Sequence, residues 1–236
     1  MTEDKTLKIA WQNQEKVPGL ISGDDALRVY NSLPEQARIG LRIIDYEGKP
    51  TMVGSTVFAV ANLDVFAQQY GARTPNLGDL SKPEIMRIAK GKHYIDSRNL
   101  IARTREDTNW SKNNALLKTI YELAEQKEGS LKHPFMIEGF SFVPNPEDKK
   151  GYGLILVANP DFRVIQDERF YGKYNGEKFS EVDESGIPNF DRKGSRIWYA
   201  KSNGLSWLGL GRNSNLYSCN DYLDNSHNGG RVVFLK

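Results

Sequence analysis

The segment from residue 204 to residue 236 constrains the fold most strongly, because it combines a regular apolar pattern with a narrow set of polar residues. Leu208 and Leu210 occupy alternate positions, and side chains alternate between the two sides of an extended segment. The leucines are therefore predicted to face a core. The opposite side is predicted to be an open surface that carries Trp207, Gly209 and Gly211.

Apolar residues continue at Leu216 and Leu223, and the chain closes with Gly230 followed by the apolar run 232–235. β-Branched residues favour strands, and a continuous apolar run is typical of a strand that is buried on both sides. We therefore predict that the C-terminus is folded in as a buried terminal strand.

The polar residues between these anchors come from a restricted alphabet. No Lys, Glu, Gln or Met occurs between Leu208 and Gly230, although 26% of the chain is charged. The codons AAC and AAT, when randomised at their adenines, can encode Asn, Asp, Ser, Gly, Tyr, His, Cys or Arg, but never Lys, Glu, Gln, Met or Trp. The pattern predicts a rewritable binding surface that also includes Asn213, Asn215, Cys219, Asn220, Asp221, Tyr222, Asp224, Asn225, His227 and Asn228.

An ordinary surface loop is the alternative interpretation, because Asn, Asp, Ser and Gly hydrogen-bond to their own backbone and tolerate left-handed conformations. The ordered apolar skeleton and its matching register favour the binding surface. In such a surface Trp207 and Tyr222 are expected to be the aromatic anchors, and the polar residues are expected to set specificity through hydrogen bonds.

The same segment resembles the variable region of the target proteins of diversity-generating retroelements. In such families an error-prone reverse transcriptase, mutagenic at template adenines, rewrites surface positions and leaves the scaffold codons unchanged. Trp207 departs from this pattern, because an AAC codon cannot yield Trp. The resemblance rests on Leu208, Leu210, Arg212, Leu223, Ser226 and the runs Gly204-Leu205-Ser206, Leu216-Tyr217-Ser218 and Gly230-Arg231-Val232-Val233.

The resemblance implies a C-type-lectin-like domain of the formylglycine-generating-enzyme-like subclass, with its N- and C-terminal strands side by side. It also implies a ligand that is a protein or another cell-surface molecule. Upstream of residue 204 the likeness is only general. There, a helix-rich first half and a strand-rich second half indicate an α+β class, with a small antiparallel sheet and long loops in a single domain over residues 1–236.

Local patterns predict the elements of the first half. A capping-box spacing at Ser22 opens a helix that Pro34 ends, and a turn at 47–50 joins the strands 39–46 and 52–60 in a hairpin.

Three more helices and four strands follow along the chain. The helices run from Asn62 to Tyr70, onward from Ser81, and from Ser111 to Gln126 before Gly129. The strands are predicted at 135–142, 153–157, 162–165 and 196–200.

Charge and composition bound the partners. A formal net charge of +2 gives no strong field, so neither nucleic acid nor an anionic membrane is implied. The first residues lack the pattern of a secretion signal, and no segment approaches the length of a membrane span, which predicts a cytoplasmic or virion-associated protein without membrane insertion. The single cysteine, Cys219, permits no internal disulfide. The oligomeric state stays open.

No cofactor or metal is predicted. His93, His133 and His227 are too scattered for a zinc site, and the segments 144–148 and 188–191 are explained by Asx-Pro turns rather than by calcium. No phosphate loop, nucleophile elbow or metalloprotease helix occurs, so the chain is not expected to be an enzyme.

Two other functions remain as alternatives. A phage or virion adhesin could bind one fixed partner through the same face. An enzyme of lectin-like fold could use Asp161, Asp167 and Glu168, although no motif joins these carboxylates. The cations Arg87, Lys90 and Lys92 crowd the end of a predicted helix, where the helix dipole favours them without any ligand.

Overall fold

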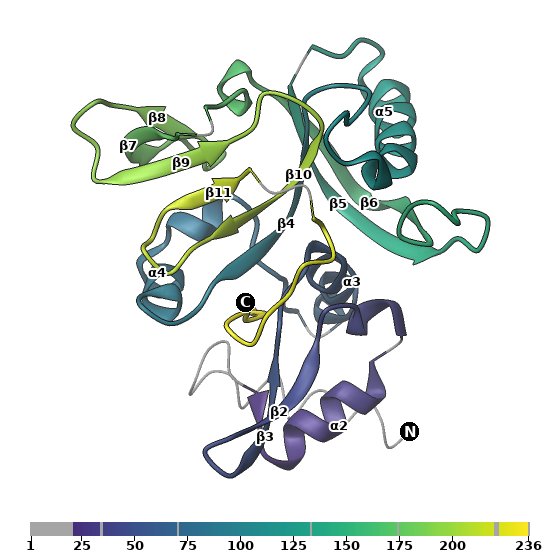
Figure 1. Ribbon diagram of the computed structural model, residues 1–236, viewed down its shortest axis with the longest axis vertical. Helices are drawn as coiled ribbons and strands as arrows, with labels where there is room; N and C mark the ends of the chain where they lie inside the picture. The colour runs from purple at the N-terminus through teal and green to yellow at the C-terminus, as the bar shows by residue number, and fades with distance from the viewer. Residues whose placement is uncertain are drawn as a thin grey trace.

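Two β-sheets organise the part of the chain that the structure describes (Figure 1). This computed structural model describes residues 21–33, 35–69, 71–132, 134–173, 175–219 and 222–235. The second half supplies most strands of the larger sheet, and the first described residues form the smaller one. The fold is therefore of the α+β class, as the sequence predicts.

The larger sheet has eight strands and is not the small sheet that the sequence suggests. Its order is β6-β5-β4-β10-β11-β9-β7-β8, and each neighbouring pair is antiparallel except β11 and β9, which are parallel. Because β4 pairs with β10, the C-terminal segment is built onto the middle of the sheet. The strands are β4 (Ile95–Ala102), β5 (Phe135–Pro144), β6 (Leu154–Gln166), β7 (Glu177–Val182), β8 (Pro188–Phe190), β9 (Arg196–Ala200), β10 (Leu205–Leu210) and β11 (Leu216–Ser218).

The smaller sheet is antiparallel, in the order β1-β3-β2, and the helix α2 (Asp24–Ser32) packs against it. Its strands are β1 (Ile21–Ser22), β2 (Arg42–Tyr46) and β3 (Lys49–Val53). The first predicted helix is confirmed, and so is the predicted hairpin over residues 42–53, where β2 and β3 pair. The predicted capping box is not, because the N-cap residue is Gly23 and no side chain caps the helix.

Residues 57–60 form a helix rather than the end of the predicted strand. Helix α3 (Val57–Gln68) begins after Thr56, whose hydroxyl accepts a hydrogen bond from the Ala59 N–H at 3.1 Å. Asn62 does not cap a helix: it lies inside α3, where its buried amide bonds to both backbone groups of Phe142. Nearly all of α3 is buried, so its sequence lacks the amphipathic period that separates helix from strand. The predicted end at Tyr70 lies outside the described residues.

The two later helices lie where the sequence places them. Helix α4 (Pro83–Ala89) begins with its N-cap at Lys82 and no side chain caps it, so the predicted cap at Ser81 is not found. Helix α5 (Asn114–Glu128) ends at Gly129, whose φ of 74° suits glycine. Short 3₁₀ turns accompany them: η1 (Glu35–Arg38), η2 (Gly78–Ser81), η3 (Ser111–Asn113) and η4 (Glu168–Phe170). Among the described residues, no helix is both long and apolar enough to cross a bilayer.

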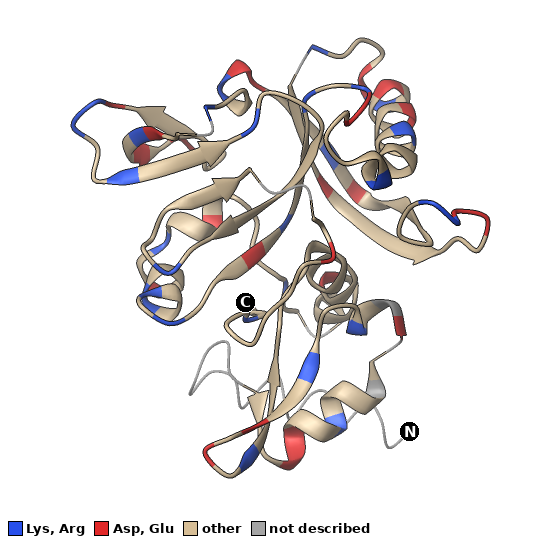
Figure 2. Cartoon of the chain, viewed as in Figure 1, with Lys and Arg blue, Asp and Glu red and all other residues tan. Residues whose placement is uncertain are grey.

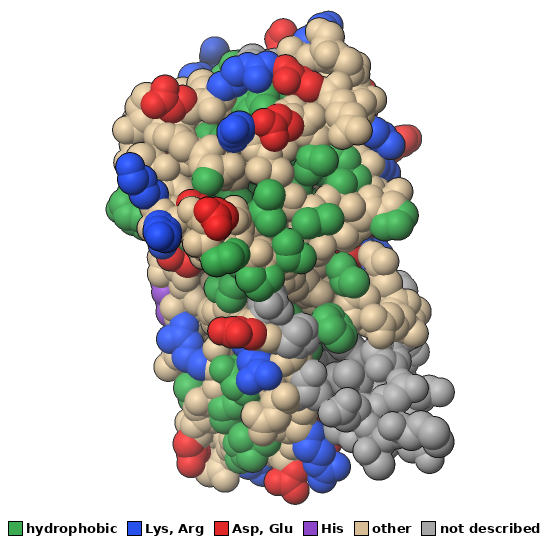
Figure 3. Space-filling model, turned by 90° about the vertical axis from the view of Figure 1, so that its right-hand side faces the viewer, with side chains coloured by type: hydrophobic (Ala, Val, Ile, Leu, Met, Phe, Trp, Pro, Cys, Tyr) green, Lys and Arg blue, Asp and Glu red, His purple; other side chains and the backbone are tan. Residues whose placement is uncertain are grey.

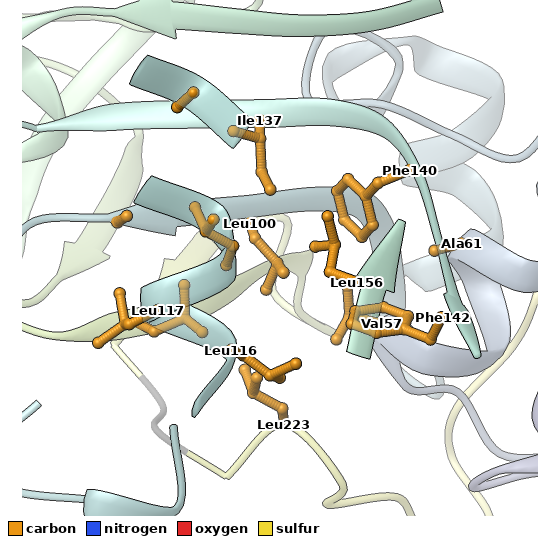
Figure 4. Close-up of a cluster of buried hydrophobic side chains, with 14 of the residues drawn as sticks. Val57, Ala61, Leu100, Leu116, Leu117, Ile137, Phe140, Phe142, Leu156 and Leu223 are labelled. Atoms are coloured by element: carbon orange, nitrogen blue, oxygen red, sulfur yellow. The ribbon is translucent and has the colours of Figure 1, made fainter. Parts of the chain in front are cut away.

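The C-terminal segment packs into the main hydrophobic core through Leu223. This side chain is 1% exposed and belongs to a cluster that includes Leu116 and Leu117 of α5 and Leu100 of β4. Figure 4 shows Leu223 beside Leu116, below the strands of the sheet. The predicted role of Leu223 as an internal anchor is therefore confirmed.

The chain end is folded in, but it is not a strand of either sheet. Leu235 exchanges backbone hydrogen bonds with Arg73, and Gly230 forms a single bridge with Tyr94. Val232 packs in the cluster of the smaller sheet, whereas Val233 packs in that of the larger one. The apolar run 232–235 is therefore buried because it connects the two hydrophobic clusters, and not because it forms a central strand. The implied pairing of N- and C-terminal strands is not found among the described residues.

Exposed apolar side chains also lie on the β5–β6 hairpin. Val143, Ile155 and Val157 are exposed there. Figure 3 shows apolar side chains gathered on this side of the molecule. Single exposed hydrophobic residues are common on protein surfaces, and these do not contribute to the site below.

Arg103 holds the C-terminal strands from inside. It follows β4 and is fully buried, and its guanidinium donates to the hydroxyls of Ser206 on β10 and Ser218 on β11, at 2.7 and 2.8 Å. A third bond runs from Nε to the Phe170 carbonyl at 2.8 Å. No described carboxylate forms an ion pair with it, so burial lowers its pKa to about 9.

We expect Arg103→Met to reduce the free energy of unfolding by about 2–4 kcal/mol, because buried acceptors lose their donors while the volume stays similar. Urea denaturation measures the change. Arg105→Met, at a neighbouring but exposed position, is the control and should leave the midpoint nearly unchanged. Equal effects of the two substitutions would contradict a structural role for the buried guanidinium.

Candidate functional site

A pocket of about 460 Å³ opens between β10, β11 and the loop that precedes the chain end. It contains five of the residues predicted from the sequence, namely Trp207, Gly211, Asn213, Asn225 and His227. Four further residues line it: Tyr94, Leu210, Arg212 and Tyr217. The predicted surface is thus gathered in part around one cavity, of a size that is usual for small-ligand sites.

Trp207 covers the strand instead of leaving it open. Leu208 and Leu210 pack in one buried cluster, and Trp207 packs against another, so the predicted alternation is confirmed. Gly209 is nevertheless buried, because the Trp207 ring lies over it: a β-carbon there would be 2.2 Å from Cζ3 of the ring. The expectation that Gly209 is an open surface position is therefore wrong for this chain.

A second ring lies against Gly211. A β-carbon at this glycine would stand 2.4 Å from Cε2 of Tyr217. The Tyr217 ring is stacked on Tyr199 with centroids 4.9 Å apart, and its hydroxyl lies 3.2 Å from the amide nitrogen of Asn213. Tyr217 therefore forms a fixed wall, supported from behind and hydrogen-bonded at its tip.

Tyr94 and His227 form the opposite wall. Their rings meet edge to face at 5.2 Å, and the His227 N–H donates to the Tyr94 hydroxyl at 2.9 Å. The same hydroxyl lies 3.3 Å from the Ser55 carbonyl, just before α3. Through these bonds Tyr94 ties the loop near the chain end to the body of the protein. Tyr94 directly precedes β4, a strand that the sequence patterns did not predict. Its aromatic side chain was the one local feature of the sequence that could have indicated a wall of the site here.

Two predicted positions are less open than expected, since Asn215 is buried and Cys219 is half-buried. Asn215 is 7% exposed, and its side-chain oxygen accepts a hydrogen bond from the Ile197 N–H at 2.8 Å. It belongs to the frame and not to the open surface. Cys219 is half-buried, and burial raises the pKa of its thiol despite the nearby cations Arg103 and Lys201.

The remaining predicted positions lie outside the pocket. Tyr222 is exposed and packs on Trp110 with centroids 4.3 Å apart, while Asp224 forms an ion pair with Lys112 at 2.7 Å. Asn228 is exposed, and its carbonyl accepts a hydrogen bond from Arg231. Asn220 and Asp221 lie outside the described residues.

A buried carboxyl group lies beneath the Trp207 ring. Asp96 of β4 is 3% exposed, and its Oδ1 has no hydrogen-bond partner among the described residues. This oxygen and the Trp207 ring share the space above Gly209. Burial raises the pKa of Asp96 to about 7, although the nearby Ser55 hydroxyl acts in the opposite direction.

The described residues offer little to a metal or a catalytic mechanism. They contain no group of three or more His, Cys, Asp or Glu that could hold an ion. His93 is half-buried, and His133 lies outside the described residues. Asp161 and Glu168 are exposed, and Arg169 pairs with Asp167, lowering the pKa of that carboxyl. None of these three carboxylates lines the pocket.

Comparison of the chain with protein-family models, with curated proteins and with solved structures yields no match.

We expect Asp96→Asn to stabilise the protein more at high pH than at low pH. The carboxyl keeps its proton up to a pKa of about 7 when folded, against 3.8 when unfolded. The unfolded chain loses the proton first, so the folding penalty grows between about pH 4 and pH 7 and reaches roughly 4 kcal/mol above that range. Asn cannot ionise and removes this pH-dependent penalty.

Denaturant unfolding at low and at neutral-to-alkaline pH measures the effect, with the exposed Asp161→Asn as the matched control. A stability difference between Asp96→Asn and the unchanged protein that is constant with pH would contradict the raised pKa, because the carboxyl would then ionise over the same pH range in the folded and unfolded states.

Proposed function

We propose that this chain is a ligand-binding protein with a C-type-lectin-like domain, and that its C-terminal surface is diversified by adenine-directed retroelement mutagenesis. The ligand would enter the pocket lined by Trp207, Asn213, Asn225 and His227 and extend over the neighbouring exposed loop. The ligand class is a protein or another cell-surface molecule, and the binding requires no cofactor.

The division between frame and surface supports this proposal. Most positions that the sequence assigns to the frame are buried, with Arg212, Tyr217 and Ser226 as exceptions, whereas Asn213, Asn225, His227 and the neighbouring Asn228 are exposed. The buried frame positions are Leu205, Ser206, Leu208, Leu210, Leu216, Ser218, Leu223, Arg231, Val232 and Val233.

The glycines give the strongest support, because some are required by the backbone whereas others are bordered by side chains. Gly204 has a φ of 68°, and a β-carbon on Gly230 would lie 2.6 Å from the backbone nitrogen of Ser55. Backbone conformation or a close backbone approach therefore requires glycine at both frame positions. Gly209 and Gly211 have no positive φ. Beside Gly211 stand only side chains, the Tyr217 ring and the Asn213 amide oxygen, whereas a β-carbon at Gly209 would meet the Trp207 ring and would lie 3.0 Å from both Asp96 Oδ1 and the Ile95 carbonyl oxygen.

Substitution at Gly211 would consequently displace the Tyr217 ring instead of straining the backbone, whereas substitution at Gly209 would also crowd the Ile95 carbonyl. In a diversified protein such a change would reshape the pocket while the frame stays folded. The exposed Asn and His side chains would adjust hydrogen bonding to each ligand, as small polar residues do in antibody binding sites. Aromatic side chains supply contact area at modest entropic cost.

The direct test is deep sequencing of the 3′ end of this gene in its natural population, together with a search of the adjacent DNA for a near-duplicate template. We expect substitutions at adenine-containing codons for the positions at 207–228 that we assign to the surface. The codons for Leu208, Leu210, Leu223 and Gly230 should stay unchanged, because their side chains or backbone hold the frame.

An invariant 3′ end without a template copy would contradict diversification. The same pocket would then be assigned to one fixed partner, as in an adhesin of constant specificity.

A further inference from the structure

The pocket combines two kinds of residue, and this inference about its ligand rests on the function proposed above. Trp207, Gly211, Asn213, Asn225 and His227 belong to the surface assigned to diversification. Tyr94, Leu210, Arg212 and Tyr217 belong to the frame or to the body of the protein, yet they also line the pocket. The frame residues would offer the same chemistry to every ligand.

Among the residues that the structure describes, Arg212 is the only charged side chain that lines the pocket, and no described Asp or Glu accompanies it there. It is exposed, and no described carboxylate forms an ion pair with it. Its backbone is nevertheless fixed, because the Arg212 carbonyl accepts a hydrogen bond from the Gly91 N–H at 2.8 Å. The Arg212 backbone is therefore anchored beside the pocket, and the guanidinium keeps its hydrogen-bond donors available to a ligand.

The surroundings add positive charge. Lys90 and Lys92 are exposed in the turn between α4 and β4 that contacts Arg212. Figure 2 shows cationic segments gathered at this end of α4, beside the β10–β11 loop. The half-buried His93 side chain responds to the same field: burial, followed by Arg231, Lys92 and Arg212, lowers its pKa.

The walls of the pocket are aromatic or apolar. Trp207, Tyr94, Tyr217 and Leu210 surround a volume of about 460 Å³, which holds one aromatic ring and part of a peptide backbone. Part of the polar capacity is already used, because the Asn213 side chain and the Tyr217 hydroxyl bond to each other. A sugar with many hydroxyl groups would find few free partners on this wall.

We propose that the pocket binds an acidic peptide segment of a partner protein, with one aromatic side chain between the walls and an adjacent carboxylate on Arg212. The aromatic side chain would pack against Trp207 and Tyr217. The carboxylate would accept a two-pronged hydrogen bond from the guanidinium, in a geometry that lysine cannot reproduce. A cationic group at the same place would be repelled.

Three matched peptides test the charge preference: the acetylated, amidated dipeptides tyrosyl-glutamate, tyrosyl-glutamine and tyrosyl-lysine. Their affinities for the full chain are measured by nuclear magnetic resonance titration. We expect the glutamate peptide to bind roughly tenfold more tightly than the glutamine peptide, as a charge-assisted hydrogen bond gives, and the lysine peptide to bind most weakly. Raising the salt concentration should reduce the preference.

Arg212→Gln should abolish the preference while leaving the glutamine peptide's affinity nearly unchanged. Because Arg212 is exposed, this variant is expected to fold, and its resonances report directly whether it does. The matched control is Arg192→Gln, an exposed arginine outside the pocket, which should keep the preference.

Equal affinity for the glutamate and glutamine peptides, or an unchanged preference in Arg212→Gln, would overturn the proposal. Tighter binding of N-acetylneuraminic acid than of the glutamate peptide would overturn it in favour of an acidic glycan. These outcomes concern the ligand alone, since population sequencing tests diversification without any ligand. The proposed ligand can therefore be wrong while the proposed diversification is right, and the reverse also holds.

Discussion

The C-terminal segment depends on one buried cation. The Arg103 guanidinium lies at the point where β4, β10 and β11 come together, and it donates to Ser206, Ser218 and the Phe170 carbonyl. The two serine hydroxyls also lie 2.8 Å from each other, so the group forms a closed network. Burying a guanidinium is costly, and three well-placed acceptors offset much of that cost. The strands beside the pocket are thereby fixed from the inside, without using their outer surface.

This arrangement separates stability from recognition. The interior of the segment is held by Arg103 and by leucines that reach into two hydrophobic clusters. The outer side carries rings that rest on glycines and small polar side chains that contribute little to the core. Asp96 is an exception, since a buried carboxyl with a raised pKa opposes folding at neutral pH. Its place under the Trp207 ring links that cost to the floor of the pocket.

Sequence patterns predicted the elements whose apolar period is unambiguous. The amphipathic face of α5, the alternation around Leu208 and Leu210, and the anchor at Leu223 all have the predicted roles. The central strand β4 was missed, because Asp96, Ser97, Arg98 and Asn99 interrupt its apolar character even though all of them are buried. Buried polar residues are satisfied by distant partners, such as Asp64 for Arg98, which no local pattern encodes.

Only part of the candidate site could be predicted, because the rest of it also depends on tertiary contacts that local patterns do not encode. Alternation along β10 identifies the side of the strand on which Trp207 lies, but not that the ring folds back over Gly209. The wall from Tyr94 depends on the distant pairing of β4 with β10 and on the bridge to Gly230, whereas Tyr217 lies in the local β10–β11 hairpin and stacks on Tyr199 of β9. Asn215 looks like its neighbours in composition, yet it is buried because the Ile197 backbone needs an acceptor there.

The most direct measurement for this account is a saturation mutagenesis scan of residues 204–235, scored by resistance of the displayed protein to proteolysis. The account predicts that positions 211, 213, 225, 227 and 228 tolerate most residues, whereas Gly204, Ser206, Ser218, Leu223 and Gly230 tolerate almost none. Uniform tolerance, or intolerance at the exposed polar positions, would contradict the separation of a fixed frame from a rewritable surface.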